Sequence, residues 1–332
     1  MSLKEVFRAE RERTVPGHVN LLHYLGALAF IFFLLQIATG ILLMIYYRPS
    51  VAAAYYSTAV IMDEVRVGWL IRSLHYWGGH LVILLILLHV IRVYFSRAYQ
   101  SPRQLTWAAG ICLLIVALAL AFTGTLLPWD QYAYWYTDSA RRTISGIPGI
   151  GPALLALLWG GWELGEEVLL RFYAFHIAVL PWLAFLCLFL HMVLVWRLGL
   201  KAPTVAQRPH ASPTPFFPDF LLNLMIVVFL VGGLLLSVAL ILPPPLLEAA
   251  DPLTPLVDAR PHWYFLPLRE LLLHVSRGLA TLGLGAFFVV LFLVPLLDRE
   301  EVQPAWKRAL QRGLGLAVIA LWLFLATKGY LR

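Results

Sequence analysis

Four histidines lie inside long apolar segments, at spacings that could hold two metal-bound groups. His75 and His89 are 14 residues apart in one segment, and His176 and His191 are 15 apart in another. At about 3.6 residues per turn the members of each pair share roughly one helix face, and at about 1.5 Å per residue they lie about 21 Å apart along the axis. Two parallel helices of this kind present two facing pairs of imidazoles, which is the ligand set of a bis-histidine haem.

Other interpretations of these histidines are weaker. A single intramembrane histidine is often a hydrogen-bonded packing residue, but polar groups in hydrocarbon are costly and are usually functional. Zinc would need about four ligands converging at one depth, rather than two. We interpret His80, which lies between the two levels, as a packing or hydrogen-bonding residue. The predicted ligand pairs of two b haems are His75 with His176 and His89 with His191.

Glycines recur at the same spacing in the two neighbouring apolar segments. The missing side chains would let flat macrocycles approach these helices closely at both haem levels, although small residues also serve helix packing. The four positions are Gly26 and Gly40 in the first segment, and Gly110 and Gly124 in the third.

Two arginines flank the histidines of the second segment. Arg72 and Arg92 each lie three residues beyond a histidine, towards the membrane surface. Because arginine pairs well with carboxylates, each could neutralise haem propionates. The alternative is that these side chains reach the lipid headgroups.

The elements that position these residues are transmembrane helices. Of the 332 residues, 61% are hydrophobic and only 13% are charged, whereas the surface of a soluble domain would need far more charge. A spanning helix needs about 20 apolar residues, and seven segments qualify. They are about Leu21–Tyr47, Leu74–Tyr94, Leu105–Leu127, Phe172–Trp196, Phe220–Leu242, Gly278–Leu297 and Leu314–Leu331.

We therefore predict an all-α membrane protein, with a four-helix haem-binding bundle followed by three further helices. A proline-rich stretch, Lys201–Pro218, separates an N-terminal part (1–205) from a C-terminal part (206–332). An eighth apolar run, Ile147–Trp162, is broken by prolines and glycines, so we expect an interfacial hairpin or short helices there. The two cysteines are too few for a disulfide framework and are expected to pack in the spans.

The charges are distributed unequally between the two sides of the membrane. With seven spans, the side that holds the N-terminus carries 14 of the 25 Lys and Arg residues and 7 of the 18 Asp and Glu residues, and the opposite side carries 11 of each. By the positive-inside tendency the first side is cytoplasmic, so we call it the n-side and the other the p-side. We expect a bacterial cytoplasmic membrane, no cleavable signal peptide and no nucleic-acid partner.

At this point the sequence resembles cytochrome b of the cytochrome bc complexes, over nearly its whole length. It is most similar to the split form of oxygenic photosynthesis, cytochrome b6 plus subunit IV, here joined in one polypeptide. The 15-residue step between His176 and His191 also resembles the split form. The motifs that carry the resemblance are VPGHVN (Val15–Asn20), QIATG (Gln36–Gly40), GWLIRSLH (Gly68–His75), PWDQ (Pro128–Gln131) and RFYAFH (Arg171–His176).

The resemblance implies a mechanism and a set of partners. Quinol would be oxidised in a p-side pocket, one electron passing to a Rieske iron–sulfur protein and the other through both haems to an n-side quinone site, with proton translocation. His75 and His176 would bind the low-potential haem, and His89 and His191 the high-potential one. A c-type cytochrome would accept electrons, and the complex would be a dimer.

The p-side pocket of the family is marked by a Pro-Glu-Trp-Tyr motif, from which this chain departs. It has Pro261, His262, Trp263 and Tyr264. Quinol oxidation needs a proton acceptor, and a histidine with a pKa near its ordinary value of about 6.5 could replace the carboxylate. The alternative is that His262 is inert and the pocket is altered. The three tyrosines that follow Trp129 could line this pocket or form an interfacial aromatic belt; they are Tyr132, Tyr134 and Tyr136.

Two further expectations follow from the resemblance. On the n-side, the candidates for the quinone-reducing pocket are His18, Asn20, Arg197 and Asp219. Relatives of the split form carry a cysteine in the first span that attaches an extra c-type haem. Here that position is Phe32, so we predict no covalently bound haem.

Three classes of function compete. The first is the cytochrome b subunit of a bc-type quinol:cytochrome c oxidoreductase. The second is a di-haem membrane anchor that conducts electrons for another quinol-linked complex without bifurcation. The departure from the family motif at His262 keeps this alternative open. The third is a transporter or a structural membrane protein, which would show no b-type absorption band.

Overall fold

The computed structural model describes residues 14–17, 19–199, 201, 212–256, 259–299 and 303–331. Seven helices in these ranges are long and apolar enough to cross a membrane, so the predicted all-α membrane fold is confirmed. They are α2 (Leu25–Tyr46), α4 (Gly68–Phe95), α5 (Gln104–Leu126), the helix Glu166–Leu198, the segment Phe216–Ile241, α12 (Arg277–Leu297) and α13 (Ala305–Leu331). The segment Phe216–Ile241 has non-helical backbone at Phe217 and contains the regular helix α10 (Leu221–Ile241).

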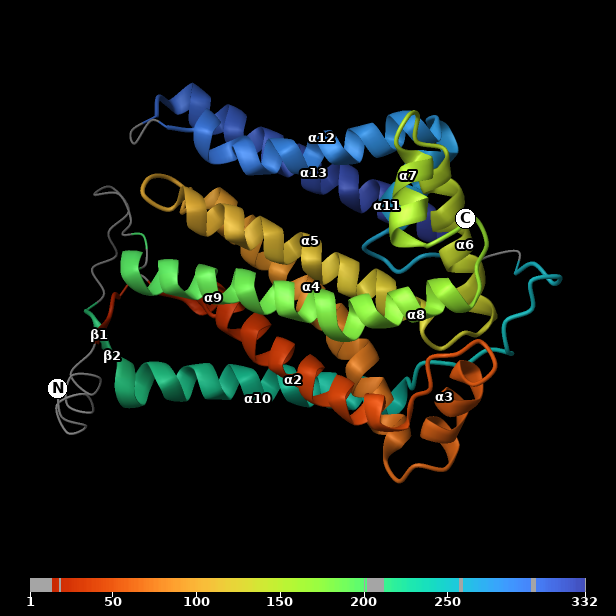
Figure 1. The fold of residues 1–332 in the computed structure, drawn as a ribbon. Coiled ribbons are helices and arrows are strands. Elements are labelled where there is room, and N and C mark those ends of the chain that lie inside the picture. Colours follow the sequence, from red (N-terminus) through yellow and green to blue (C-terminus); the bar gives the residue numbers. More distant parts are fainter. Residues whose placement is uncertain are drawn as a thin grey trace.

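Shorter helices gather at one end of the spans (Figure 1), the end predicted to be the p-side. The run Ile147–Trp162 does not form a span and contains only α7 (Gly151–Leu158). The other short helices are α3 (Ala54–Asp63), α6 (Gln131–Ser145), α8 (Glu166–Ala174) and α11 (Leu266–His274). At the opposite end lie η1 (Leu21–His23) and a small antiparallel pair of strands, β1 (Thr14–Val15) and β2 (Thr214–Pro215).

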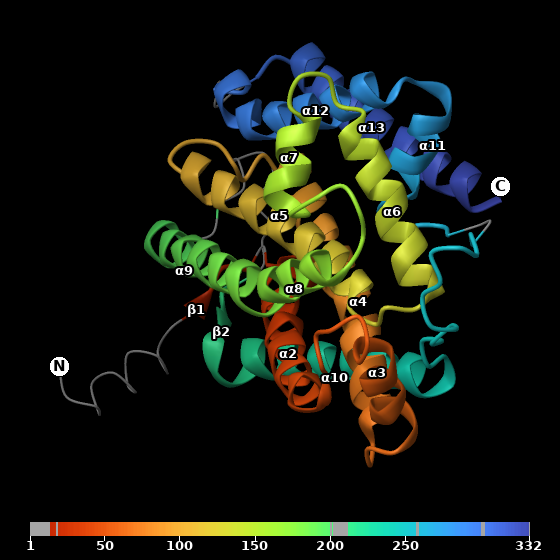
Figure 2. The same ribbon diagram turned by 45° about the vertical axis from the view of Figure 1, so that its right-hand side comes forward.

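Four spans form the central bundle. α2 packs along α4, and α5 packs along the last part of the fourth span, α9 (Leu180–Leu198), while α4 and α5 join the two pairs. The C-terminal spans cover two opposite sides of this bundle (Figures 1 and 2): α10 lies beside α2 and α4, whereas on the far side α12 packs on α5 and α13 contacts α4. The outer faces of the spans are apolar and exposed, as lipid-facing surfaces are; Trp182, Phe185, Phe189 and Trp196 of α9 are examples.

The fourth span contains a π-helical turn, η2 (Phe175–Val179), between α8 and α9. Pro181, at the start of α9, has no N–H and so cannot close the regular hydrogen bond to Ile177. A π turn holds about one residue more than an α turn. The extra residue explains how His176 and His191, 15 residues apart, keep the phase that His75 and His89 reach with 14 residues in the regular helix α4.

A buried polar cluster ties the α4–α5 connection to the end of α12. Asp298, which caps α12, accepts two hydrogen bonds from Arg97, at 2.8 and 2.5 Å, and one from the Tyr99 hydroxyl at 2.7 Å. Gln100 and Gln303 also donate to its carboxylate, at 3.3 and 2.6 Å. Burial raises the pKa of Asp298, but these hydrogen bonds outweigh burial and hold the pKa below its usual value.

Candidate functional site

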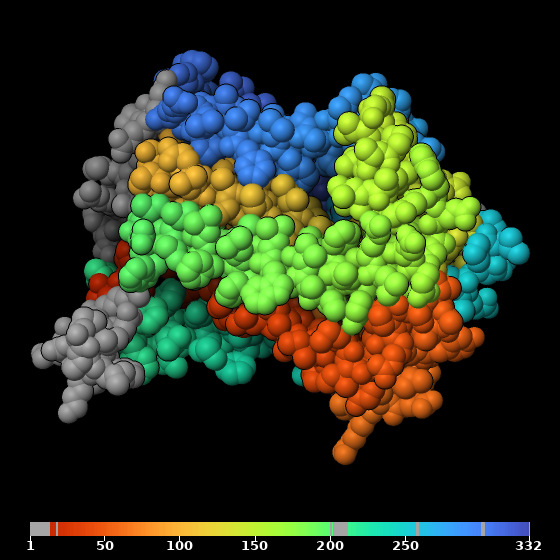
Figure 3. Space-filling model, viewed as in Figure 1, coloured from red at the N-terminus to blue at the C-terminus, as the bar shows by residue number. Residues whose placement is uncertain are grey.

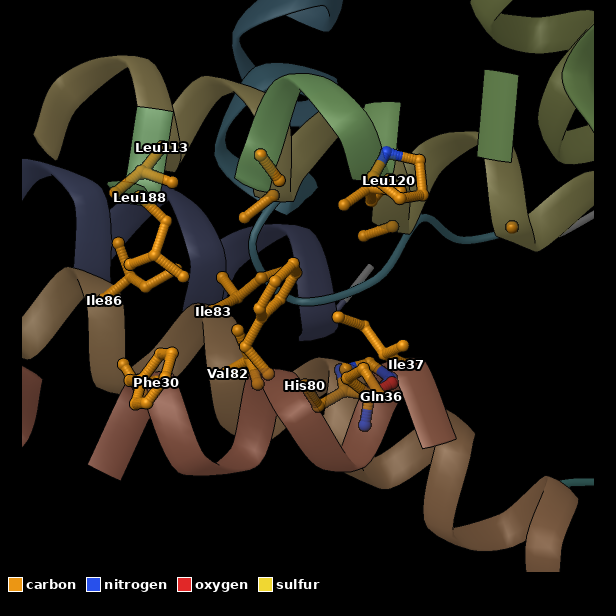
Figure 4. Close-up of a pocket in the computed structure, with 18 of the residues that line it drawn as sticks. Phe30, Gln36, Ile37, His80, Val82, Ile83, Ile86, Leu113, Leu120 and Leu188 are labelled. Carbon is orange, nitrogen blue, oxygen red and sulfur yellow. The ribbon is translucent and has the colours of Figure 1, made fainter. Parts of the chain in front are cut away.

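A cavity of about 1000 Å³ runs through the bundle and is lined from both ends of α4. On the face seen in the space-filling view, α9 lies between α2 and α5 and forms part of the outer surface of the bundle (Figure 3). Its middle is apolar: Figure 4 shows Leu113, Leu188 and Ile86 there, and Gln36 and His80 are the only polar side chains among the ten that it labels. All four predicted haem ligands and all four predicted glycines line this cavity.

The four histidines form two facing pairs. The ring centroids of His75 and His176 are 6.1 Å apart, and those of His89 and His191 are 6.4 Å apart. A metal ion between two imidazole nitrogens, about 2 Å from each, places the centroids about 6 Å apart, because each centroid lies about 1.1 Å behind its nitrogen. The residues present therefore fit an iron held between each pair.

Hydrogen bonds fix the tautomer of three of these rings. Nδ1 of His176 donates to the Leu120 carbonyl, and Nδ1 of His191 to the Thr106 carbonyl, both at 3.0 Å. The hydroxyl of Thr39 donates to the Leu35 carbonyl, so it accepts from Nδ1 of His75 at 2.9 Å. In all three rings Nε2 keeps a free lone pair, as a metal ligand needs, and the partner of Nδ1 orients the ring.

The glycines make room for the imidazoles themselves. A Cβ added at Gly124 would lie 2.6 Å from Cε1 of His176, and one at Gly110 would lie 3.5 Å from Cε1 of His191. On the other side of the bundle, Gly40 and Gly26 face His75 and His89, with corresponding distances of 3.2 and 3.1 Å. Each glycine of the predicted set is thus paired with one histidine, a relation that the 14-residue spacing alone did not predict.

The arginines lie at the two ends of the cavity. Arg72 lines it near His75 and also donates to the carbonyls of Pro244 and Pro245, at 2.8 and 3.3 Å, in the loop after α10. Arg92 lines it near His89. A role of either residue in binding propionates stays a prediction.

Next to the p-side histidine pair, His262 lies among aromatic rings. Its Nε2 is 3.2 Å from the Thr125 hydroxyl, and its ring contacts those of Tyr132 and Tyr264, with centroids 5.8 and 5.6 Å away. His262 and Tyr264 line the cavity, whereas the indole of Trp263 donates to Nδ1 of His80 at 3.0 Å. Pro261 is not among the lining residues.

Burial changes the acid–base properties of this group. It lowers the pKa of His262 to about 4, below the ordinary value near which we expected the proton acceptor to titrate. The imidazole is desolvated, which disfavours its charged form. Burial also raises the pKa of Tyr264 well above its ordinary value, so this phenol stays neutral. His262 is therefore a neutral imidazole over the physiological pH range.

The tyrosines of α6 separate into two faces. Tyr132 and Tyr136 are one helical turn apart, stack at a centroid distance of 5.8 Å, and both contact the His262 ring. Tyr134 lies on the other face of the helix, against Trp129 and Trp135, because a step of two residues rotates a side chain by about 200°. Two of the three tyrosines thus contact His262, and of the three Tyr132 alone lines the cavity.

Comparison with known proteins places this arrangement in a family. The family model for Cytochrome b/b6/petB matches residues 10–199, and that for Cytochrome b(C-terminal)/b6/petD matches residues 249–331. The chain belongs to the cytochrome b/b6 family. It is an integral multi-pass membrane protein that joins a cytochrome b6-like region and a subunit IV-like region, as the resemblance predicted.

Relatives with known names agree with this assignment. Cytochrome b6 of Synechococcus elongatus is 41% identical over 189 residues, which are 57% of this chain and 88% of that protein. Cytochrome b6 of Prochlorococcus marinus is 36% identical over 203 residues, 61% of this chain and 93% of that protein. A chain of a solved structure titled Hyperthermophilic respiratory Complex III matches with a TM-score of 0.88 and 26% identity, over 99% of this chain and 89% of that one. These similarities agree with a protein of the cytochrome b/b6 family, which implies b-type haem.

Of the n-side quinone residues predicted for this cytochrome b, none that the structure describes lines the cavity. Arg197 and Asp219 are exposed and do not line the cavity, and Asn20 caps η1 by accepting from the Leu22 N–H at 3.1 Å. His18 lies outside the described residues. The n-side end of the cavity is instead lined by His23, Arg92, Arg103 and Lys201. Sequence reasoning missed three of these, because a charged residue at the end of a span is usually only a solvated flank.

Phe32, at the position where split-form relatives are expected to carry a cysteine, is buried. It packs in α2 with Leu28 of the same helix and Leu235 of α10. This aromatic side chain offers no thiol for a covalent attachment, so the absence of a c-type haem in this chain stays a prediction.

Proposed function

We propose that this cytochrome b binds two b haems, the p-side one between His75 and His176 and the n-side one between His89 and His191. The observation that carries the proposal is the pair of facing imidazoles at each level, with ring centroids 6.1 and 6.4 Å apart. The free lone pairs on Nε2 and the glycine opposite each ring support it. When bound, the haems would supply one-electron transfer along the bundle from the p-side to the n-side.

The same proposal makes the pocket around His262 the site of quinol oxidation. The pocket opens on the cavity next to His75, so a quinol ring there would lie close to the p-side haem site. His262 would accept a proton from the quinol hydroxyl, while Tyr132 and Tyr264 would hold the ring and exclude water. With its pKa lowered to about 4, His262 has a proton affinity like that of an ordinary glutamate, at about 4.3.

The proposed partners are those of a bc-type complex. The match to a chain of a respiratory Complex III supports a Rieske iron–sulfur protein, a c-type cytochrome and membrane quinone as partners. We further propose a dimer in a bacterial cytoplasmic membrane, with the N-terminus on the cytoplasmic side and a quinone-reducing site on the n-side.

The test is to purify the chain with its native partners and to measure quinol:cytochrome c reduction in the wild type and in His262→Ala. We expect wild-type turnover with a Rieske iron–sulfur signal in the EPR spectrum. In His262→Ala we expect turnover to fall by about 10²-fold or more, because a general base is lost, at unchanged haem content. Unchanged turnover in His262→Ala would remove this residue from the mechanism.

The two competing classes give different results. A di-haem anchor without bifurcation would reduce its haems with quinol but would co-purify without a Rieske signal. A transporter or structural protein would show no b-type band in a reduced-minus-oxidised spectrum.

A further inference from the structure

His80 of α4 lies beside His262 and has one fixed tautomer. Its Nδ1 accepts a hydrogen bond from the indole N–H of Trp263 at 3.0 Å. An indole N–H can only donate, so Nδ1 of His80 carries a lone pair and the ring proton of the neutral side chain is on Nε2. In the described part of the chain, Nε2 of His80 has no hydrogen-bond acceptor, and the ring lines the cavity.

Hydrogen bonding fixes the opposite tautomer in His262, with the proton on Nε2 held by a protein group and the lone pair on Nδ1 free. The Thr125 hydroxyl donates its only proton to the Ala121 carbonyl at 2.8 Å, so at 3.2 Å it accepts from Nε2–H of His262. Nδ1 of His262 therefore keeps a free lone pair. The two rings are perpendicular, with centroids 4.9 Å apart. One pocket thus holds a histidine that can accept a proton and another that can only donate a hydrogen bond.

We infer that Nε2–H of His80 donates a hydrogen bond to an oxygen of the quinol or quinone head group, and that Trp263 keeps His80 in this donor form. The inference rests on the proposed function, since it requires quinol in the pocket of His262. His80 is a positioning residue for the ring and accepts no proton, because the lone pair on its Nδ1 already accepts from the Trp263 indole N–H. Quinol oxidation releases two protons: His262 accepts one of them, and the other leaves towards the Rieske partner that takes the first electron, so neither goes to His80.

Two alternative roles for His80, a second base and a packing residue, fit the structure less well. A second base would need a free lone pair, which the bond from Trp263 removes from His80. A packing residue would need no polar partner and would not have to line the cavity. A fixed donor beside a fixed acceptor suits a head group that carries a hydroxyl before oxidation and a carbonyl after it.

The test compares four variants in the purified complex, with decylubiquinol and menadiol as substrates, using whichever gives the higher kcat/KM. His80→Leu removes the donor, and His80→Gln keeps an N–H donor together with a carbonyl that can accept from Trp263. Trp263→Phe removes the bond that fixes the tautomer. Trp135→Phe, in α6, is the matched control, because its indole donates to the Thr254 carbonyl at 3.1 Å and does not line the cavity, whereas the Trp77 ring contacts His80 at a centroid distance of 5.4 Å.

We expect KM for quinol to rise about three- to tenfold in His80→Leu, as for the loss of one hydrogen bond, with haem content intact. KM should return to within about twofold of wild type in His80→Gln and should rise about two- to fivefold in Trp263→Phe. Trp135→Phe should match the wild type. A second readout is the infrared band of the corresponding quinone labelled with ¹³C at its carbonyls, whose hydrogen-bonded component should be lost in His80→Leu and kept in His80→Gln.

An unchanged KM and an unchanged infrared band in His80→Leu would overturn the role of His80. If His80→Leu does not assemble, an unchanged KM in Trp263→Phe overturns it instead. The proposed function fails separately, when His262→Ala turns over at the wild-type rate or when neither quinol is oxidised. If His262→Ala turns over slowly while KM and the infrared band of His80→Leu are unchanged, only the inference about His80 is refuted.

Discussion

At the scale of single residues, His262 determines how quinol oxidation should depend on pH. Burial lowers its pKa to about 4, so the imidazole is neutral and able to accept a proton at any pH well above that value. Below its pKa the ring is already protonated and cannot act as a base. A carboxylate in the same place would behave in the opposite way, because burial raises the pKa of an acid.

We therefore predict a flat rate of quinol oxidation between about pH 8 and pH 5, with a loss as the pH falls through about 4. In His262→Glu the loss should begin at a higher pH than in the wild type, since the buried carboxyl is protonated more readily. Stopped-flow haem reduction after short pH jumps measures both profiles. A wild-type rate that falls through pH 6.5 would show that His262 is solvated and not buried as described.

The glycines opposite the histidines give a second prediction at this scale. A Cβ at Gly124 would lie 2.6 Å from the His176 ring, whereas one at Gly110 would lie 3.5 Å from the His191 ring, an ordinary contact. We expect Gly124→Ala to displace His176 and lose most of the p-side haem, and Gly110→Ala to keep both haems. Pyridine haemochrome content per chain measures this difference. Equal haem loss in both variants would mean that the glycines serve only helix packing.

At the scale of elements, the sequence predicts the long apolar helices well and the short ones poorly. The seven spans were predictable because hydrocarbon requires about 20 apolar residues in a row. The ends of the spans were less predictable: α4 begins at Gly68, six residues before the predicted Leu74, and this first part of the helix contains the charged Arg72. The helices α3 and α6 were missed, since they lie at the surface and lack a long apolar run.

The π turn is the element that sequence spacing alone could not locate. It allows a prediction, because deleting Val179 from η2 would turn the π turn into an α turn and leave the phase of α9 almost unchanged. Deleting Leu84 from the regular helix α4 would rotate one end of that helix by about 100° against the other. We expect the Val179 deletion to keep both haems and the Leu84 deletion to lose at least one. Loss of both haems in the Val179 deletion would contradict this account of the 15-residue step.

At the scale of the whole molecule, the C-terminal spans are not a separate layer but enclose the haem bundle from two sides. The Asp298 cluster is one of the links between them, because its carboxylate, on α12, accepts from Arg97 and Tyr99 in the connection after α4. The division of the chain at residues 205 and 206 remains a prediction. The sequence could not show this cluster, since its partners are about 200 residues apart in the chain and meet only through the packing of α12 on α5.

We predict that Asp298→Ala lowers the free energy of unfolding by about 3 kcal/mol, since it leaves buried donors without their acceptor. Asp251→Ala, in an exposed loop, is the control and should have little effect. Because the pKa of Asp298 is held below its ordinary 3.8, its contribution should be complete above that pH and lost as the pH falls below it. Thermal unfolding in detergent at pH 7 and pH 3.5 measures both effects. Equal stabilities of Asp298→Ala and the wild type at pH 7 would contradict the role of the cluster.

The part of the candidate site that could be predicted consists of residues that recur at a regular spacing in the sequence. The four histidines were found because two pairs at matched depths are rare in hydrocarbon, and the structure places them face to face. The role of Trp263 as a partner of His80 depends on a contact between residues 183 positions apart, and no local pattern encodes it. A role of Arg197 and Asp219 in binding quinone on the n-side stays a prediction, and both residues lie exposed at the ends of spans.

The central claim is that two irons are held between the paired imidazoles of α4 and the fourth span. The most direct measurement is the amount of haem per chain in the purified wild type and in His75→Leu and His89→Leu, together with low-temperature EPR of the oxidised haems. The account predicts about two low-spin bis-histidine haems in the wild type, with loss of the p-side signal in His75→Leu and of the n-side signal in His89→Leu. A colourless wild-type protein after full haem supply, or two unchanged haem signals in both variants, would contradict it.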